Sequence, residues 1–309
     1  MNLRMLSRRK FIEMGAMACG AARLLSANPL GLPIGLELYT VENELKRDLA
    51  GTLKAIAQIG YKTVEWPQFA TKAGAVELKR ALDEVGLRCP SVHYTMFDLQ
   101  EGFESAVKAA KALGAEYLIC SAPMPRDAKR KLAEKDGSQR FYDAVNNMAI
   151  DDWKWNADQL NHYGELAHKA GLQLGYHNHN VEFQRFGGVV PYDLLLHSTE
   201  PKLVVFEMDC GWVTVAGESP AGYIEKYPNR VRMLHVKDFR PGFKPTTVQA
   251  EGVPTPTELG RGSIAYQAIF KAAKQAGVRY YFVEQEPPFR EMPVLEAIKT
   301  DFEYLHNLV

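Results

Sequence analysis

Short apolar runs alternate with longer amphipathic segments from about residue 33 to the end of the chain. The apolar runs are rich in β-branched and aromatic residues, as buried parallel strands are, and the segments between them carry the 3.6-residue period of helices. This pattern predicts strands at about 33–39, 61–66, 88–94, 116–121, 172–178, 202–209, 231–236 and 279–285. Eight strands separated by helices favour a closed (β/α)8 TIM barrel.

Several predicted helices end at a glycine, which is the usual left-handed stop before a chain turns into the next strand. The clearest amphipathic segments are 44–59, 76–85, 103–113, 150–170 and 263–276. Two connections are longer than the others, at about 122–149 and 239–262, and we expect them to shape a substrate pocket at the catalytic end of the barrel.

A doubly wound open sheet is the competing architecture. It favours a glycine-rich phosphate loop after the first strand, but the sequence there is Tyr39-Thr40-Val41-Glu42-Asn43, which has no glycine. No domain boundary is evident, so we expect one barrel over residues 33–309.

Six of the predicted strands end in an ionisable residue. These residues are Glu65, His93, His177, Asp209, His235 and Glu284. Charged and imidazole groups next to buried strands are costly unless they are used, and the carboxyl ends of barrel strands meet at one mouth. The sequence therefore predicts one shared polar site.

The last four strands supply the residues best suited to bind a metal. Asp209, His235 and Glu284 offer two carboxylates and an imidazole, and His177-Asn178-His179-Asn180-Val181-Glu182 follows the fifth strand. A hard oxygen and nitrogen set of this kind suits one Mn²⁺, Mg²⁺, Co²⁺ or Zn²⁺ ion. Glu286 is a rival of Glu284, because residues two apart on a strand point to the same side.

These residues resemble the xylose isomerase-like barrel superfamily of sugar isomerases, epimerases and dehydratases, over about residues 33–308. The motif His-Asn-His-x-x-Glu-Phe in this chain is similar to that of the exported or soluble sugar phosphate isomerase/epimerase subgroup of the superfamily. The resemblance implies metal binding by Asp209, His235 and Glu284 and by a carboxylate after the fifth strand. The usual Glu at that strand end is His177 here, so our order of preference for the fourth ligand is Glu182, then His177, then His179.

The related DNA-repair endonucleases place a second histidine three residues after the strand-six aspartate. This chain has Trp212 at that position, which argues against an endonuclease. We expect Trp212 to contact substrate, together with Glu65, His93 and Glu286.

A metal held by a substrate's carbonyl and hydroxyl acidifies the carbon between them, so that a base can remove its proton. We expect His177 or His179 to act as base or acid and Lys237 to stabilise the resulting oxyanion. The resemblance favours a sugar isomerase or epimerase acting on a non-phosphorylated sugar or keto-sugar. A 3-keto-sugar lyase or dehydratase similar to inosose dehydratase is the first alternative, and a non-catalytic carbohydrate-binding barrel is the second.

Residues 1–27 have the features of a twin-arginine export signal. They contain Ser7-Arg8-Arg9-Lys10-Phe11-Ile12, followed by a short Ala/Gly/Met-rich stretch. This stretch contains Glu13 and is too short for stable membrane insertion. We therefore expect a periplasmic protein.

Charge and cysteine content argue against two further classes, nucleic-acid-binding and disulfide-rich proteins. The chain's net charge is zero, and the five basic residues and one acidic residue of 1–27 leave the rest near −4, which offers no basic field for nucleic acid. Only Cys89, Cys120 and Cys210 follow residue 27, an odd number that does not suggest a disulfide framework. A small carbohydrate is the expected partner, and the resemblance also implies a homo-oligomer, whose interface one sequence does not reveal.

Overall fold

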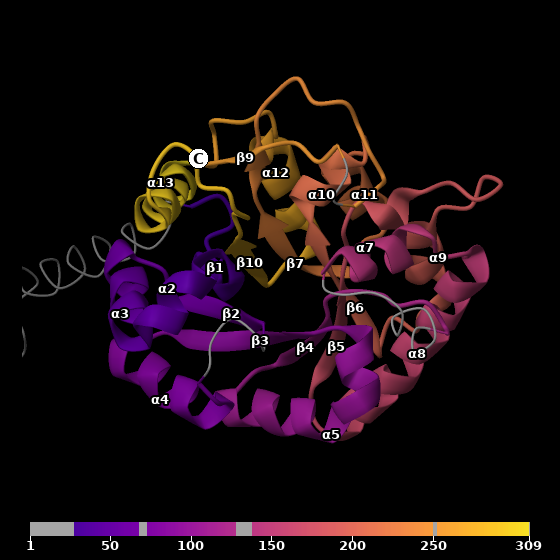
Figure 1. Cartoon of the computed structure of the whole chain (residues 1–309), viewed down its shortest axis with the longest axis horizontal. Coiled ribbons are helices and arrows are strands. Elements are labelled where there is room, and N and C mark those ends of the chain that lie inside the picture. Colours follow the sequence, from indigo (N-terminus) through magenta and orange to yellow (C-terminus); the bar gives the residue numbers. More distant parts are fainter. Residues whose placement is uncertain (1–27, 68–72, 128–137, 250–251, 309) are drawn as a thin grey trace, which may run out of the picture.

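The computed structural model describes residues 28–67, 73–127, 138–249 and 252–308. The predicted leader at residues 1–27 lies outside the described residues. Eight parallel strands form a closed barrel in the order β1, β2, β3, β4, β5, β6, β7, β10, with β10 paired to β1. Figure 1 shows these strands at the centre, with helices wrapped around them. The predicted TIM barrel is confirmed for the described part of the chain.

The barrel strands lie close to their predicted positions. They are β1 Gly35–Glu37, β2 Thr63–Pro67, β3 Arg88–Tyr94, β4 Tyr117–Cys120, β5 Gln173–His177, β6 Val204–Asp209, β7 Val231–Val236 and β10 Tyr280–Val283. A separate antiparallel pair, β8 (Asp238–Phe239) and β9 (Pro256–Thr257), lies in the second long connection.

The helices cover the outside of the barrel. They are α2 Glu42–Arg47, α3 Leu49–Ile59, α4 Ala75–Val85, α5 Met96–Leu113, α7 Ser138–Asn146, α8 Ile150–Lys169, α9 Pro191–Ser198, α10 Cys210–Val215, α11 Pro220–Lys226, α12 Tyr266–Ala276 and α13 Val294–Asn307. Short 3-10 turns η1 (Leu38–Val41) and η3 (Val181–Phe183) follow β1 and β5. The last helix, α13, packs against α3, so both ends of the barrel sequence lie side by side (Figure 1).

The predicted helix 44–59 is wrong as a single element. Asp48 is extended (φ −150°, ψ 91°), and its carboxylate accepts a hydrogen bond from the Gly51 N–H. The aspartate therefore ends α2 and caps the start of α3, because an aspartate competes with the helix by bonding to nearby backbone.

The predicted helix 103–113 begins earlier than the pattern suggested. Thr95 and Asp98 form a reciprocal capping box that starts α5 at Met96. Gly102 lies in a non-helical kink within α5. This kink interrupts the helical pattern of the sequence, so the turns before Gly102 were not predicted. The first long connection also contains a helix, α7.

The barrel core has two layers. Outward-facing residues of the strands pack against the helices in one large apolar cluster. Inside the barrel, a small buried layer consists of Tyr117, Ile119, Val205, Met233 and Phe282. This layer fills the barrel interior below the polar residues at the strand ends.

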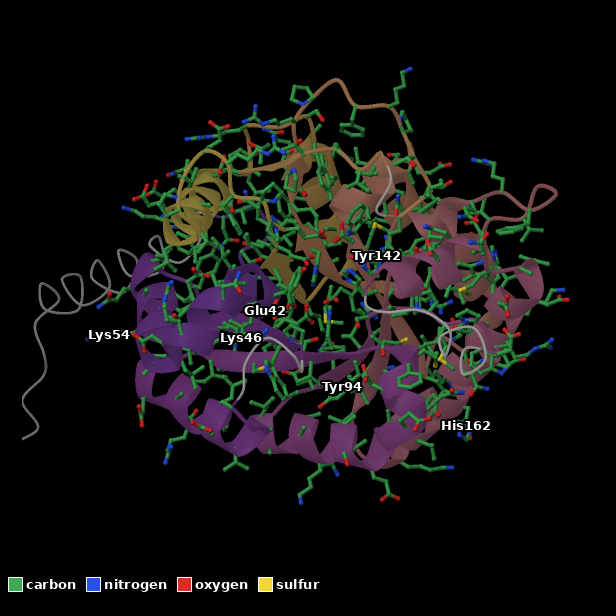
Figure 2. All side chains as sticks on the ribbon, viewed as in Figure 1. Glu42, Lys46, Lys54, Tyr94, Tyr142 and His162 are labelled. Atoms are coloured by element: carbon green, nitrogen blue, oxygen red, sulfur yellow. The ribbon has the colours of Figure 1, made fainter. Side chains whose placement is uncertain are left out.

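The outer surface carries the histidines that the sequence analysis left without a role. His162, His168, His197 and His306 are exposed, and His162 lies at the outer edge of α8 in Figure 2. Ion pairs such as Lys46 to Glu42 on α2 also lie on this surface (Figure 2). Within the described residues, none of the helices has the length and apolar character needed to cross a membrane.

Candidate metal centre

The inward-facing positions at the carboxyl ends of the strands carry a ring of polar residues. All of its members are buried: Glu37, Glu65, His93, His177, Glu207, Asp209, His235 and Glu284. Strand register brings neighbours together, with Glu37 beside Glu65, His177 beside Glu207, and Asp209 beside His235. The predicted shared polar site is therefore present.

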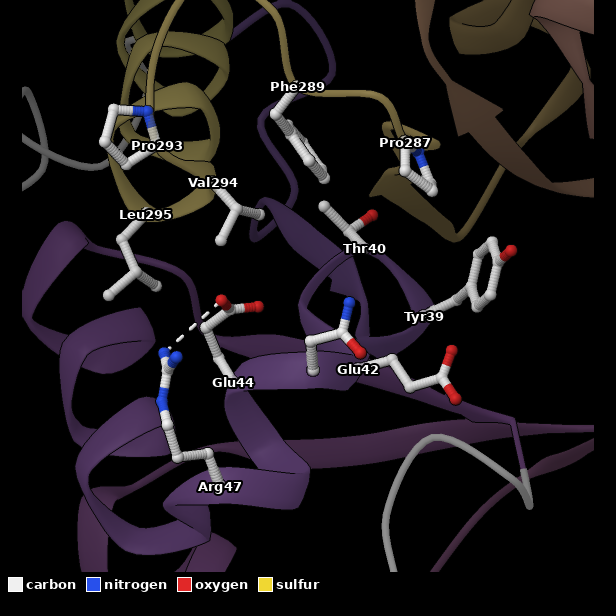
Figure 3. Close-up of a pocket in the computed structure, with 11 residues that line it drawn as sticks. Tyr39, Thr40, Glu42, Glu44, Arg47, Pro287, Phe289, Pro293, Val294 and Leu295 are labelled. Atoms are coloured by element: carbon white, nitrogen blue, oxygen red, sulfur yellow. Dashed lines mark hydrogen bonds and ion pairs between the residues drawn. The ribbon is translucent and has the colours of Figure 1, made fainter.

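A cavity of about 470 Å³ opens above this ring. Its lining includes Glu37, Tyr39, His93, Tyr142, His177, His179, Trp212, His235, Glu284 and Glu286. A volume of this size is in the range of small-molecule sites. A second hollow of about 350 Å³ lies beside it and shares Tyr39; Figure 3 shows that Phe289, Val294 and Leu295 form its apolar wall and that Arg47 pairs with Glu44 at its edge.

Four residues of the ring form a compact set that can hold a metal. The ligand atoms of His177, Asp209, His235 and Glu284 lie within 4.8 Å of one another. His235 Nδ1 is 2.8 Å from Glu284 Oε2 and 4.0 Å from Asp209 Oδ2, while His177 Nε2 is 3.9 Å from Asp209 Oδ2. We call these four residues the outer set.

Two further carboxylates fix the orientation of both histidines. His235 Nε2 lies 2.6 Å from Glu65 Oε2, and His177 Nδ1 lies 3.2 Å from Glu207 Oε2. If each of these nitrogens carries the proton, the other nitrogen of each ring presents its lone pair to the outer set. Histidine ligands are normally held in this way, so the outer set fits a divalent cation.

Lys237 lies at the edge of the outer set. Its Nζ is 2.8 Å from Asp209 Oδ2, 2.7 Å from Glu284 Oε2 and 3.0 Å from Glu286 Oε1, and it sits over the Trp212 ring. Burial alone would lower the pKa of Lys237, but the three carboxylates outweigh it and raise that pKa well above its usual value. The lysine is therefore a charged proton donor next to the cavity.

In the structure, His177 rather than Glu182 groups with Asp209, His235 and Glu284. Glu182 accepts hydrogen bonds from the Tyr176 hydroxyl at 2.7 Å and from the His179 backbone N–H at 3.0 Å. Burial raises the pKa of Glu182 to about 7. This carboxyl closes the turn after β5 and is not in the outer set, so the geometry favours His177 as the fourth ligand, and the identity of that ligand stays a prediction.

His179 is half-buried and lines the cavity. Its ring centroid lies 5.1 Å from that of His177 and 5.9 Å from that of Trp212. Burial, followed by the positive charge of Lys237, lowers the pKa of His179 to about 3. The ring is therefore neutral near pH 7.

The four predicted substrate-binding residues divide into two groups. His93, Trp212 and Glu286 line the cavity, as a contact residue must. Glu65 lies deeper and is fully buried, where its oxygens bond to Ser91 Oγ and to His235. Its position suits orientation of His235 rather than contact with substrate.

The sequence analysis missed Glu37 and Glu207. Both were inside apolar runs that we interpreted as wholly buried strands. A signal was present for Glu207, because it stands two residues before Asp209 on the same strand and so faces the same side.

The fold and this ring define a TIM barrel with a buried histidine and carboxylate cluster at its mouth that can hold a metal. The family model described as xylose isomerase-like TIM barrel matches residues 53–308. The chain belongs to this family of enzymes.

Three relatives illustrate the similarity. The chain is 28% identical over 245 residues to an inosose dehydratase of Geobacillus thermodenitrificans, covering 74% of this chain and 76% of the relative. It is 27% identical over 243 residues to an inosose dehydratase of Clostridium perfringens, covering 72% and 77%. The crystal structure of a sugar phosphate isomerase/epimerase from Parabacteroides distasonis is 25% identical, with a TM-score of 0.68, and covers 89% of this chain and 94% of that one.

Proposed function

We propose that the chain is a divalent metal-dependent lyase that eliminates a β-oxygen from a sugar or cyclic polyol carrying a ketone. The single observation that carries this proposal is that Lys237, whose Nζ pairs with Asp209 and Glu284 of the outer set, and His179, which lines the cavity, both lie close to the Trp212 ring. Elimination needs one base for the carbon proton and one acid for the leaving oxygen, and this pair supplies both.

The outer set would hold the cation, with His177, Asp209, His235 and Glu284 as ligands. A bound divalent cation would polarise the substrate's carbonyl and make the adjacent C–H more acidic. Carboxylate and imidazole ligands suit Mn²⁺, Mg²⁺, Co²⁺ or Zn²⁺.

His179 would remove the proton from the carbon next to the ketone, and Lys237 would give a proton to the β-oxygen as its bond to carbon breaks. The products are an unsaturated ketone and water, or an alcohol if the leaving oxygen carries a second group. One proton is taken and one is given, so the reaction is balanced, and solvent exchange restores both residues. Trp212 provides an apolar face on which a sugar ring can stack.

The names of the curated relatives support the lyase, since both are inosose dehydratases with similarity over most of their length.

The second candidate is the sugar isomerase or epimerase expected from the sequence. The similarity to the Parabacteroides distasonis protein favours it. Both reactions start with the same proton abstraction and differ only in whether carbon is reprotonated or the β-oxygen leaves.

Incubation of the metal-loaded protein with an inosose or a 3-keto-glucoside in D₂O separates the two candidates. A lyase produces the ultraviolet absorption of an unsaturated ketone, while an isomerase returns a deuterated isomer in the NMR spectrum. We expect His179→Ala to slow the reaction by about 10²- to 10⁴-fold, and the exposed His168→Ala to leave it unchanged. Deuterated isomer without any unsaturated product would refute the lyase.

A further inference from the structure

A second group of ligand-type residues lies next to the outer set, on the side of strands β1, β2 and β3. It consists of Glu37, Glu65, His93 and Glu207, which we call the inner cluster. His235 Nε2 also contacts this cluster, 2.6 Å from Glu65 Oε2 and 3.3 Å from Glu207 Oε2. His93 Nε2 lies 2.7 Å from Glu207 Oε2 and 3.1 Å from Glu65 Oε2. A ligand atom of Glu37 lies within 4.8 Å of those of Glu65 and His93.

The charge balance differs between the two groups. In the outer set, one divalent cation would balance Asp209 and Glu284, and Lys237 would balance Glu286. In the inner cluster, three carboxylates are buried to at least 99%. Within the described residues, the ion-pair partners of Glu65 and Glu207 are all imidazoles. Buried carboxylates are costly unless a cation or hydrogen bonds compensate them.

Hydrogen bonds do not fully compensate the inner cluster. Glu37 Oε2 and Glu207 Oε1 are buried and have no hydrogen-bond partner among the described residues. The other oxygen of Glu37 accepts only the Tyr39 backbone N–H, at 3.0 Å. Native proteins leave few buried polar atoms unsatisfied, so each of these two oxygens is available to a further partner such as a cation or a water molecule.

The spacing of the inner atoms suits a metal as well as a hydrogen bond. A single N–H on His93 Nε2 can point directly at Glu65 or at Glu207, but not at both. Metal to ligand distances near 2.0–2.2 Å place ligand atoms roughly 3 Å apart around one ion, and the two distances from His93 bracket that value.

We propose that the inner cluster binds a second divalent cation through His93 Nε2 and carboxylate oxygens of Glu65 and Glu207, with Glu37 as a further oxygen ligand. Three carboxylates and one imidazole form a mainly hard donor set, for which Mn²⁺ is well suited. The proposal is independent of the reaction assigned to the outer set.

The number of Mn²⁺ ions bound per chain tests the proposed inner site. The full chain and its variants are loaded with Mn²⁺, passed over a desalting column and measured by elemental analysis. His93→Gln and Glu37→Gln remove inner ligands without touching an outer one, and Asp209→Ala removes an outer ligand. Exposed Glu77→Gln is the matched control, and circular dichroism shows whether each variant is folded.

We expect two equivalents in the wild type and in Glu77→Gln, and about one in each of the other three variants. One wild-type equivalent that survives in His93→Gln and disappears in Asp209→Ala would overturn the inner site and leave the outer set standing. One wild-type equivalent that disappears in His93→Gln and survives in Asp209→Ala would support the inner site and refute the outer set. No bound Mn²⁺, or one ion lost in both variants, would overturn the second site.

Electron paramagnetic resonance of the wild type gives a test that does not depend on variant folding. Two Mn²⁺ ions bound at neighbouring sites interact magnetically. The spectrum at two equivalents should therefore differ in shape from the spectrum at one. A spectrum that grows in proportion without changing shape would contradict the proposal.

Discussion

His235 Nε2 lies 2.6 Å from Glu65 Oε2, although the two residues are 170 positions apart in the chain. This contact fixes which nitrogen of His235 faces the outer set. A carboxylate partner of this kind also raises the basicity of a ligating imidazole. Glu65 is therefore placed to influence metal binding by the outer set through His235.

Glu65→Gln should weaken metal binding, because a neutral amide holds the His235 proton less strongly than a carboxylate does. We expect the dissociation constant for Mn²⁺, measured by competition with a chelator, to rise about 10- to 100-fold. Glu77→Gln on the exposed face of α4 serves as the control. An unchanged affinity would show that Glu65 does not orient His235.

His177→Ala and Glu182→Gln distinguish the two candidates for the fourth outer ligand. Because His177 lies in the outer set and Glu182 closes a turn, we expect His177→Ala to lose metal and Glu182→Gln to keep it. Elemental analysis of both purified variants is the measurement. Retention by His177→Ala with loss from Glu182→Gln would restore the order of preference given by the sequence.

Asp301 should make stability fall as the pH rises. Burial raises the pKa of Asp301 to about 8 in the folded chain, whereas the unfolded value is near 3.9. The folded state therefore holds a proton that the unfolded state releases, so the free energy of unfolding should decrease by up to about 1.4 kcal/mol per pH unit between these two values.

The variant Asp301→Asn isolates this effect, because an amide oxygen can still accept the Leu259 N–H. Relative to the wild type, the variant should gain stability from pH 4 to pH 8 and show a constant difference above pH 8. Urea unfolding at several pH values measures this. A difference that does not change with pH would contradict the raised pKa.

Gly262→Ala should destabilise the fold. A Cβ at this position would lie 2.4 Å from the Phe239 carbonyl oxygen and would also press on the Asp238 carboxylate. That carboxylate accepts hydrogen bonds from the backbone N–H groups of Gly260, Ser263 and Ile264 as well as Gly262. We expect a loss of about 1–3 kcal/mol in the free energy of unfolding.

Gly74→Ala is the matched control for this substitution. Nothing lies within 4 Å of a Cβ built at Gly74, and its φ of −72° suits any residue. Thermal unfolding of both variants should show a lowered midpoint for Gly262→Ala alone. An equal shift in both would mean that contact with the Asp238 loop is not the cause.

Export through the twin-arginine route stays a prediction from the sequence. Replacing Arg8 and Arg9 together by lysine should keep the charge but remove the signal, so the full chain should stay in the cytoplasmic fraction of a bacterial host. Cell fractionation with immunodetection is the measurement. Equal periplasmic amounts of both forms would refute this route.

The strands and the barrel were predictable because their apolar runs and strand-end polar residues repeat along the chain. The break at Asp48 was not, since it depends on one side chain competing with the helix backbone. Glu182 was placed first among ligand candidates because it is the carboxylate that follows β5. Its real direction is set by Tyr176 and by the fold of η3, which sequence distance does not reveal.

The five apolar side chains beneath the ring, Tyr117, Ile119, Val205, Met233 and Phe282, have a kinetic consequence. Because they fill the barrel interior, a molecule in the cavity above the ring has no route through the barrel axis. Substrate must therefore enter, and product must leave, by the same mouth. Accumulated product should then compete directly with incoming substrate, so that turnover slows as the ratio of product to substrate rises.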